Sequence, residues 1–515
     1  MTECPSVNPL EDKTRPKKNV EPCILVIFGA TGDLTGRKLI PALYNLARDG
    51  QLPGHFACVG FARRPKTNEQ FRVEMLADVN KYSRNRPVDD EVWHSFNNQL
   101  FYHQSEFDND EGYESLGRLL DQLDKQFATK HNRLYYLSTQ PSYFPQIIEK
   151  LNKHHLVYDA DQVHDKWSRV IIEKPFGHDL KSAEQLQKEI SQHLSESQIY
   201  RIDHFLGKET VQNLLVFRFS NSIFEALWNN HHIDHVQITV SEEMGIGTRG
   251  RLWEEAGMLR DIVQNHMMQL LCLVAMEPPA SLKADAIHTE KIKVLNAIRE
   301  LPPKRLSEVA IRGQYGPGYI GGNEVKGYRE EDNVSKVSTV ETYAALKLSI
   351  DNWRWDGVPF YLRAGKRLAK RSTEIAIVFK RAPGYLFQTE VKQNEPNILV
   401  IRIQPDEGIS LKMNCKIPGL NQLIQPVNMD FQYGSYFGAA PPEAYERLIC
   451  DCMSGDNTLF ARADEALTSW RLLTPVLDYW AEEKPADFPN YASGTWGPKA
   501  ADDLLARDGY QWRLI

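Results

Sequence analysis

The feature that most limits the possible folds is a short apolar run that ends in glycine near the start of the chain. It reads CILVIF and is followed at once by GATGDL and a helical pattern. An uninterrupted apolar run of this length is typical of a parallel strand that is buried on both faces. The runs FACVGFA, RLYYLST and RVIIEKP recur further on, separated by helical stretches such as 111–127 and 179–194. This alternation predicts an α/β domain with a parallel sheet.

The pattern changes near residue 204, where strand-like runs follow one another through turn-rich links. These runs are HVQITVSEE, TVETYAALKLSI, PFYLRAGK, TEIAIVFK, NILVIRIQ and ISLKMNCK. A chain of 515 residues is also too long for a single hydrophobic core. We therefore predict a flexible N-terminal tail over 1–20, a Rossmann-like dinucleotide-binding domain over 21–203, and a second domain over 204–515. The second domain is expected to hold a large, mainly antiparallel sheet with packed helices.

The composition argues against several classes of protein. The net charge is −7 with acidic and basic residues interspersed, which argues against a nucleic-acid partner. The seven cysteines form no C-x-x-C pair, so neither a disulfide framework nor a zinc knuckle is indicated. The start of the chain holds no apolar signal-peptide core, and no later stretch reaches the roughly 18 apolar residues of a membrane span. We expect a cytoplasmic protein without a membrane partner.

The segment after the first predicted strand has the glycines of a phosphate-binding turn. Gly29 and Gly32 stand where the strand turns into a helix, so that backbone N–H groups there are able to approach a pyrophosphate. The pattern departs from G-x-G-x-x-G, and a plain strand-to-helix turn is the alternative. Asp33 and Thr35 are expected to cap the helix, and Lys38 follows one turn later, within reach of a phosphate or a substrate.

The end of the second predicted strand indicates which nicotinamide cofactor binds. An acidic residue there binds the ribose 2′-hydroxyl of NAD, whereas an arginine accommodates the 2′-phosphate of NADP. The strand ends in GFA followed by Arg63 and Arg64, without a carboxylate. NADP is therefore favoured over NAD, and a solvated arginine pair is the alternative.

Two later segments bring charged groups toward the same edge of the predicted sheet. Lys174 follows the run RVII at the carboxyl end of a strand, where open α/β sheets bind their ligands. In the segment RIDHFLGKE, His204 and Lys208 lie four residues apart and suit a phosphate dianion, which leaves Asp203 for another partner. A strand-end lysine in water and a helix-capping aspartate are the alternatives.

A predicted helix over 257–276 carries an apolar stripe that includes His266. Such a ring is either a hydrogen-bonded core residue or faces a cleft. Asp261 lies off the stripe and is free to accept hydrogen bonds from sugar hydroxyls. Oxidation of a hemiacetal by hydride transfer needs a base for the hydroxyl proton, and His266 is our candidate. Asp203 is the candidate partner that fixes the tautomer of the ring, and no metal is required.

Four motifs, GATGDLTGRK, EKPFG, RIDHFLGKE and GMLRDIVQNHMMQLLCLVAMEPP, together resemble those of the glucose-6-phosphate dehydrogenases. PFYLRAGKRL and AYERLICDCMSGD follow in the family order, and the similarity runs from about Pro22 to near the C-terminus. The resemblance implies oxidation of glucose 6-phosphate at C1 to 6-phosphoglucono-1,5-lactone, with hydride transfer to NADP, as the first step of the pentose phosphate pathway. It also implies a homodimer or homotetramer built on the large sheet.

The resemblance also implies roles for single residues. His266 matches the family's proton acceptor, and Asp203 matches its partner in a catalytic dyad. Substrate binding is implied for Lys174, His204, Lys208, Glu242, Asp261, Lys366 and Arg371. Cofactor binding is implied for Gly29, Thr31, Gly32, Asp33, Leu34, Lys38, Arg63 and Lys174.

The sequence departs from the family pattern in two places. Phe205 stands where many relatives have Tyr, which removes one phosphate-directed hydroxyl and predicts a changed substrate affinity with the chemistry retained. Eukaryotic members also hold a second, structural NADP through basic residues of the second domain. Ser241, Ser372 and the segment around Trp496 replace those cations here, so the second site is not expected.

Two other functions fit part of this pattern. A Rossmann oxidoreductase of the glucose-fructose oxidoreductase and inositol dehydrogenase type would use Lys174 of the EKP segment for proton transfer. A catalytically inactive NADP-binding sensor would keep the fold, but a sensor has no need of a base, a dyad partner and phosphate ligands together. Replacement of His266 distinguishes the first alternative from the main hypothesis.

Overall fold

The first domain is built on a seven-stranded sheet. Its strands are β1 (Cys23–Phe28), β2 (Phe56–Ala62), β3 (Leu100–Gln104), β4 (Arg133–Leu137), β5 (Ser168–Ile172), β6 (Ile199–Ile202) and β18 (Phe460–Ala461). Six of them are parallel, in the order β3-β2-β1-β4-β5-β6, and β18 pairs antiparallel with β6 at the edge. The computed structural model describes residues 20–158, 165–383, 395–419, 423–437, 442–485 and 487–515. The predicted tail over 1–20 thus lies outside the described residues, apart from Val20.

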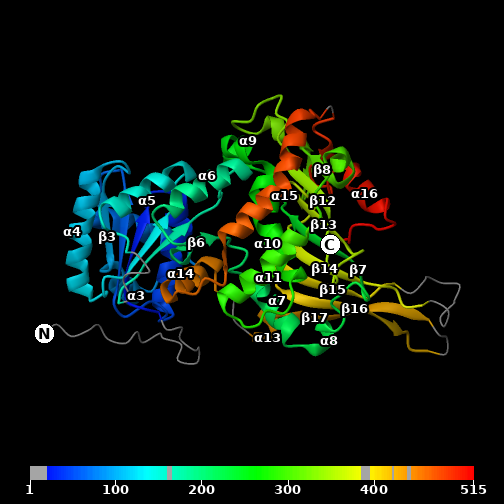
Figure 1. The fold of residues 1–515 in the computed structure, drawn as a ribbon, viewed down its shortest axis with the longest axis horizontal. Coiled ribbons are helices and arrows are strands. Elements are labelled where there is room, and N and C mark those ends of the chain that lie inside the picture. The colour runs from blue at the N-terminus through cyan, green and yellow to red at the C-terminus, as the bar shows by residue number, and fades with distance from the viewer. Residues whose placement is uncertain (1–19, 159–164, 384–394, 420–422, 438–441, 486) are drawn as a thin grey trace.

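Helices cover both faces of this sheet, which explains why the inner strands β1 and β2 are apolar and buried along their whole length (Figure 1). Alternate residues of β1 point to opposite faces, so Leu25 joins one buried apolar cluster and Val26 joins the other. The prediction of a Rossmann-like α/β domain is confirmed. Its helices are η1 (Thr35–Leu39), α1 (Ile40–Arg48), α2 (Asn68–Tyr82), α3 (Asp90–Asn97), α4 (Asp110–Phe127), α5 (Phe144–Lys153) and α6 (Leu180–Ser191), with the short turns η2 (Pro141–Tyr143) and η3 (Glu196–Gln198).

The second domain holds an eight-stranded sheet. In spatial order its strands are β17 (Ile424–Gln432), β16 (Gly408–Lys416), β15 (Ile398–Gln404), β14 (Ser372–Phe379), β7 (Ile233–Ser241), β13 (Pro359–Gly365), β12 (Tyr343–Ser349) and β8 (Ala310–Gly313). Only β7 and β13 pair in parallel among these strands, so the predicted mainly antiparallel sheet is confirmed. The sequence analysis does not predict β8 and β17, because β8 is short and β17 is largely exposed and polar.

Helices pack against this sheet, and α10, α11 and α15 lie in front of it in Figure 1. The helices after residue 208 are α7 (Glu209–Phe219), α8 (Ser222–Glu225), α9 (Gly250–Met258), η5 (Leu259–Met267), α10 (Met268–Ala275), α11 (Ala284–Ala297), α12 (Leu306–Val309), α13 (Tyr433–Phe437), α14 (Ala444–Ser454), α15 (Ala463–Glu482) and α16 (Lys499–Ala506). Short elements complete it: β9 (Tyr315–Gly316), β10 (Gly318–Ile320), β11 (Asn323–Val325), β19 (Tyr491–Ala492), η4 (Gly247–Arg249), η6 (Pro303–Arg305) and η7 (Tyr328–Glu330).

Buried side chains hold the C-terminal end of α10 in place. The last carbonyl groups of a helix have no partner within the helix and need donors from elsewhere. Trp228 Nε1 donates to the carbonyl of Val274 and Trp355 Nε1 donates to that of Ala275, each at 2.8 Å. Since α10 continues η5 without a break, these donors also fix the helix that carries the candidate base.

The late part of the chain returns to the first domain. It supplies the edge strand β18, and α15 packs against the first domain, where Trp470 Nε1 donates to the carbonyl of Phe176 at 2.8 Å. On α14, Glu446 accepts a hydrogen bond from Arg84 Nε at 2.8 Å. Residues after 204 thus complete a domain that the sequence analysis ends at residue 203.

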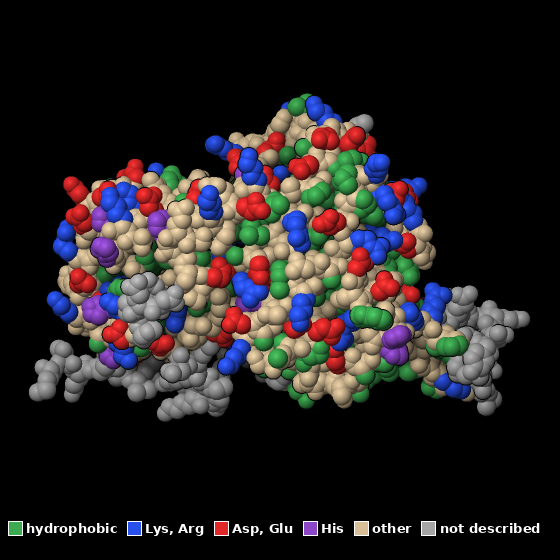
Figure 2. Space-filling model, viewed as in Figure 1, with side chains coloured by type: hydrophobic (Ala, Val, Ile, Leu, Met, Phe, Trp, Pro, Cys, Tyr) green, Lys and Arg blue, Asp and Glu red, His purple; other side chains and the backbone are tan. Residues whose placement is uncertain are grey.

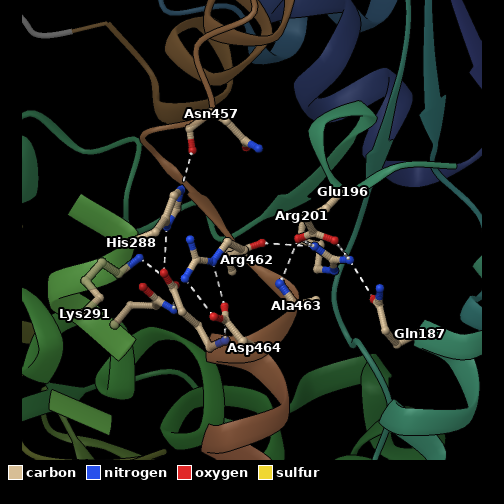
Figure 3. A network of polar contacts seen from close by, with 12 residues as sticks. Gln187, Glu196, Arg201, His288, Lys291, Asn457, Arg462, Ala463 and Asp464 are labelled. Carbon is tan, nitrogen blue, oxygen red and sulfur yellow. Dashed lines mark hydrogen bonds and ion pairs between the residues drawn. The ribbon is translucent and has the colours of Figure 1, made fainter. Parts of the chain in front are cut away.

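A buried charged cluster lies where α15 begins. Glu465 is fully buried, and its carboxylate contacts His288 Nδ1 at 2.6 Å and Lys291 Nζ at 2.7 Å. Burial opposes the ionisation of Glu465, but the charges of Lys291 and His288 outweigh it and lower the pKa of Glu465 to about 2. Figure 3 shows His288 and Lys291 on one side of the segment that leads into α15, and Arg201 of β6 on the other.

The surface carries both signs of charge. On the face drawn in Figure 2, Lys and Arg side chains are interspersed with Asp and Glu. Within the described ranges, no helix has the length and apolar character to cross a membrane. The cysteines of the described part of the chain form no disulfide.

Replacement of Glu465 by Gln is expected to destabilise the protein. The change removes the counter-charge of the buried Lys291 ammonium, and breaking a buried ion pair in this way costs about 3–5 kcal/mol. Thermal unfolding of Glu465→Gln should therefore begin at a clearly lower temperature than that of the wild type. Glu308→Gln is the control, because Glu308 pairs with Arg305 on the surface and its loss should change stability by less than about 1 kcal/mol. Equal effects of the two variants would contradict the assignment.

Candidate active site

The candidate site lies at the carboxyl edge of the first sheet, where η5 of the second domain faces the ends of β5 and β6. Asp203 directly follows β6 and is buried, and His266 lies on η5 with no exposed surface. The two side chains meet between the domains, with His266 Nδ1 at 2.5 Å from Asp203 Oδ1. The same oxygen accepts a hydrogen bond from the N–H of Phe205 at 2.9 Å. The structure thus brings together the two residues predicted to form a dyad.

The surroundings of the dyad fix the charges of both members. Burial opposes the ionisation of Asp203, but the His266 ring and the N–H of Phe205 outweigh it and lower the pKa of Asp203 to about 2. Burial also lowers the pKa of His266, against the opposing charge of Asp203. Near neutral pH, Asp203 is therefore ionised and His266 is neutral. A neutral ring held by a carboxylate is suited to accept a proton.

His266 stands on an unusual stretch of helix. Gly257 precedes it with φ of 68°, in the left-handed region, and a Cβ there would lie 2.5 Å from the carboxylate of Glu341. The stretch from Leu259 to Met267 is wound as a π-helix, a form that is frequent at functional sites. The apolar stripe predicts the inward position of His266 but contains no signal for the π winding.

Two rings of the RIDHFLGKE segment frame the His266 ring. Phe205 stacks on it with 4.2 Å between ring centroids and 15° between the planes, and His204 contacts it edge-on at 4.6 Å. Burial lowers the pKa of His204 well below its usual value, and the charges of His266 and Lys174 add to the effect. Phe205 therefore packs against the candidate base, a contact that the sequence analysis does not foresee.

Lys174 links the candidate base to Asp261. Its Nζ lies 3.1 Å from His266 Nε2 and 3.0 Å from Asp261 Oδ1, and it donates to the carbonyl of Asp261 at 2.8 Å. Because an ammonium only donates, these partners assign the lone pair to Nε2 and the proton to Nδ1, next to Asp203. Burial opposes the ionisation of Asp261, but the charges of Lys174 and Lys366 lower its pKa to about 2.

Basic side chains gather around Lys208. Its Nζ donates to Gln404 Oε1 at 2.9 Å. Burial lowers the pKa of Lys208, the charge of Glu407 opposes this shift, and the charges of Arg371 and Lys38 add to it. Cations that repel one another in this way favour an anion between them. The group suits a phosphate, as the sequence analysis expects for Lys208.

Glu242 and Lys366 form an ion pair where β7 and β13 end. Lys366 is buried, and its Nζ lies over the Trp253 ring at 4.9 Å from the centroid. Its charge also acts on Asp261, which Lys174 links to His266. Glu242 and Lys366 thus meet although they come from strands far apart in the sequence.

The predicted cofactor residues lie on the turn between β1 and η1. Gly29 has φ of 84°, and a Cβ at this position would lie 2.2 Å from the carbonyl oxygen of Ser138, so only glycine fits. The N–H of Gly32 donates to the carbonyl of Gly29 at 2.9 Å and closes the turn. The other residues of the turn, Thr31, Asp33 and Leu34, are at least partly exposed. The backbone is thus open to a ligand at the start of the helix.

The prediction that Asp33 and Thr35 cap this helix is wrong. The Asp33 carboxylate pairs with Arg37 at 2.7 Å, and Thr35 Oγ1 donates to the carbonyl of Gly29 at 3.4 Å. Neither side chain accepts a backbone N–H at the described start of η1. The helical turn already includes Asp33, so its carboxylate reaches forward along the helix to Arg37.

Two predicted cofactor-side cations are exposed and have acidic neighbours. Lys38 Nζ lies 2.9 Å from Glu443 Oε2. Arg63 follows β2, as predicted, and its side chain is 63% exposed with Nε at 3.8 Å from Glu106 Oε2. Surface pairs of this kind are worth little, so both cations remain able to exchange their partner for a phosphate.

Gly36 is a residue of this turn that the sequence analysis misses. A Cβ at Gly36 would lie 2.3 Å from Asp78 Oδ2 on α2, so the glycine allows η1 to approach α2 closely. The third glycine of G-x-G-x-x-G serves close packing of the helix in a related way. The sequence signal for this role was the last glycine of GATGDLTG, which does not stand at the position of the third glycine in G-x-G-x-x-G.

A Rossmann-like domain whose ligand edge meets a buried His–Asp dyad defines an oxidoreductase that uses a nicotinamide dinucleotide. Sequence models named glucose-6-phosphate dehydrogenase, NAD binding domain, and glucose-6-phosphate dehydrogenase, C-terminal domain, match residues 26–213 and 215–513. The chain belongs to the glucose-6-phosphate dehydrogenase family. This confirms the resemblance inferred from the four motifs.

Individual relatives cover nearly the whole chain. The glucose-6-phosphate 1-dehydrogenase of Chlamydia pneumoniae is 58% identical, covering 96% of both chains, and that of Bacillus subtilis is 45% identical, covering 96% of this chain and 99% of its own. A solved glucose-6-phosphate dehydrogenase in complex with its substrate glucose-6-phosphate superposes with a TM-score of 0.86. It is 37% identical and covers 97% of this chain and 100% of its own.

The pKa of the His266 ring is expected to lie below the usual 6.5 in the folded protein, because burial disfavours its charged form. In Asp203→Asn, the pKa of His266 should fall further, since the carboxylate that opposes the effect of burial is lost. Nitrogen NMR of the histidine rings over a pH series measures both values. A titration at or above pH 6.5 in the wild type, or a higher pKa in the variant, would contradict this reading of the dyad.

Proposed function

We propose that the chain oxidises glucose 6-phosphate at C1 to 6-phosphoglucono-1,5-lactone, with hydride transfer to NADP, as the first step of the pentose phosphate pathway. The observation that carries this proposal is the buried pair of His266 and Asp203 at the ligand edge of the dinucleotide-binding sheet. The match of the chain to relatives named for this reaction supports it.

In the proposed reaction, His266 Nε2 accepts the proton of the C1 hydroxyl. The hydrogen bond from Nδ1 to Asp203 holds the ring in the required tautomer and stabilises the imidazolium that forms. Lys174 donates toward Nε2 before substrate arrives, and we assign it to the substrate oxygen once the sugar occupies the site. Burial of the ring keeps water from competing for the proton.

The phosphate of the substrate is assigned to the basic group around Lys208, with His204 and Arg371. The mutual effect of Lys208, Arg371 and Lys38 supports the assignment, because a dianion would relieve the repulsion among these three cations, and the neutral His204 ring adds a hydrogen bond donor. Asp261, Glu242 and Lys366 are assigned to the sugar hydroxyls. Asp261 contacts Lys174, Glu242 pairs with Lys366, and the three side chains together offer both acceptors and donors.

The cofactor is assigned to the turn from Gly29 to Leu34, with Lys38, Arg63 and Lys174. The turn fits a dinucleotide because glycine at position 29 lets the chain turn tightly against Ser138, and Thr31 to Leu34 at the start of the helix are at least partly exposed. When bound, the nicotinamide ring takes up the hydride from C1. We propose NADP as the preferred cofactor because Arg63 follows β2 and is largely exposed.

Two further features belong to the proposal. We assign the chain to the cytoplasm and expect a homodimer or a homotetramer, which sedimentation analysis distinguishes. The outer strands of the large sheet support an assembly, because apolar side chains such as Val427 and Met429 of β17 are exposed there. The two alternative functions are not favoured, since a relative named for this reaction matches over 96% of the chain and both members of the dyad are in contact.

The proposal predicts formation of reduced cofactor with glucose 6-phosphate and none with unphosphorylated glucose.

His266→Asn should lower turnover by about three to four orders of magnitude with little effect on substrate binding, because the lost role belongs to the transition state. Absorbance of the reduced nicotinamide measures the rates. Unchanged turnover in His266→Asn would transfer the proton step to Lys174, and an inactive but folded wild type would support the sensor.

Arg63→Asp is expected to reduce the preference for NADP over NAD. Loss of one charge-assisted contact to the 2′-phosphate should raise KM for NADP by about tenfold or more and leave KM for NAD nearly unchanged. Arg64→Asp is the matched control, because Arg64 is its exposed neighbour. If the two variants change KM for NADP equally, the preference does not depend on Arg63.

A further inference from the structure

A small cavity lies beside the dyad and is lined by Asp203 but not by His266. Its volume is about 40 Å³, and its walls come from the ends of β5 and β6, from η5 and α10, and from α15. Asp203, Arg201 and Gln269 all line it, and each of them is at least 96% buried. Each also has one buried polar atom without a hydrogen bond partner among the described residues: Asp203 Oδ2, Arg201 Nε and Gln269 Oε1.

The chemical character of these three atoms is determined by their neighbours. Asp203 is ionised, so its Oδ2 is an acceptor. Gln269 Nε2 donates to Glu465 Oε2 at 3.1 Å, which orients the amide and leaves Oε1 as a second acceptor. Arg201 uses its two terminal nitrogens on Glu196 and Gln187, so Nε–H remains as a donor. Three residues that line the cavity therefore carry two buried acceptors and one buried donor without a partner.

Two acceptors are unable to bond each other, and unsatisfied buried polar atoms are costly. One water molecule matches the set, because it donates two hydrogen bonds and accepts at least one. A water requires roughly 10–15 Å³ when volume is measured in this way, and the cavity of about 40 Å³ has room for it. An apolar occupant would leave all three atoms without partners.

We propose that a buried water in this cavity donates to Asp203 Oδ2 and Gln269 Oε1 and accepts from Arg201 Nε, and that Gln269 is a positioning residue of the dyad. The Gln269 side chain bonds to Glu465 and not to the His266 ring. It acts through the water, which holds the second oxygen of the carboxylate while the first oxygen holds His266. This inference rests on the proposed function of the dyad.

The buried charged cluster explains why Gln269 is able to serve in this way. Glu465 is held by His288 and Lys291, and it accepts the hydrogen bond that orients the Gln269 amide. Since the Glu465 carboxylate accepts only, the amide nitrogen must face it and the amide oxygen must face the cavity. The chain of contacts thus runs from α11 through α15 and α10 to the end of β6.

A crystal structure at high resolution tests the water directly, whether or not the chain is active. We expect an ordered water within about 3.2 Å of Asp203 Oδ2, Gln269 Oε1 and Arg201 Nε. A dry cavity, or a water that contacts none of these atoms, would overturn the proposal. Failure of the proposed function would appear separately, as a wild type without activity.

The pH dependence of kcat/KM tests the positioning role. Gln269→Met keeps the length of the side chain and removes the acceptor that holds the water. The hydrogen bond from the water to Asp203 Oδ2 is then weakened, so the carboxylate acts more strongly on His266 and the pKa of His266 should rise. The acid limb of kcat/KM should then move to higher pH, and kcat should fall about tenfold with KM changed less than about twofold.

Gln264→Met is the matched control, because Gln264 lines the same cavity but donates to the carbonyl of Ala466. It should leave the acid limb in place even where it lowers stability. Gln269→Glu should restore most of kcat, because a carboxyl that shares a proton with Glu465 again offers an acceptor to the water. Equal pH profiles for the two Met variants, or no recovery in Gln269→Glu, would assign Gln269 a merely structural role.

Discussion

The contact on which the rest of the site depends is the hydrogen bond between His266 and Asp203. One member ends the last parallel strand of the first sheet and the other lies on a helix of the second domain, so the bond forms only where the domains are docked. Each residue alone would be unfavourable, since Asp203 would be a buried carboxylate and His266 a buried ring without a partner. Together they satisfy each other's hydrogen-bonding groups. The protonation state of His266 therefore depends on how the two domains pack.

The other charged side chains of the site form a network that extends outward from this bond. Lys174 lies between the ring and Asp261, and Lys366 extends the same network to Glu242. Lys366 is buried and the other three are partly buried, and each of the four has a partner of opposite charge at short range. A bound ligand takes the place of some of these ion-pair partners. The charged side chains are already in position, so they need little reorganisation when charge develops on the ligand during the reaction.

Much of the fold could be predicted from sequence, because buried parallel strands and six of the eight strands of the large sheet carry strong apolar patterns. The dyad could be predicted as well, since a base and a carboxylate follow from the chemistry and from the motifs around His266 and Asp203. The residues beside the dyad could not. Gln269 and Glu465 lie about 200 residues apart, and nothing local to either one signals their contact. The predicted capping by Asp33 was wrong because the helix already includes Asp33, whose carboxylate pairs with Arg37 instead.

The edge strand β18 has a consequence for how the protein is made. During synthesis, β6 emerges from the ribosome long before Phe460 and Ala461, its antiparallel partners. Until then the first sheet has an open edge, which is the kind of surface that invites pairing with other chains. The same interval leaves the cavity wall at Asp203 without α15. The nascent nucleotide domain therefore exposes the edge of β6 for a long part of synthesis, and chaperone binding is most useful in this interval. A chain that terminates before residue 460 keeps this edge unpaired.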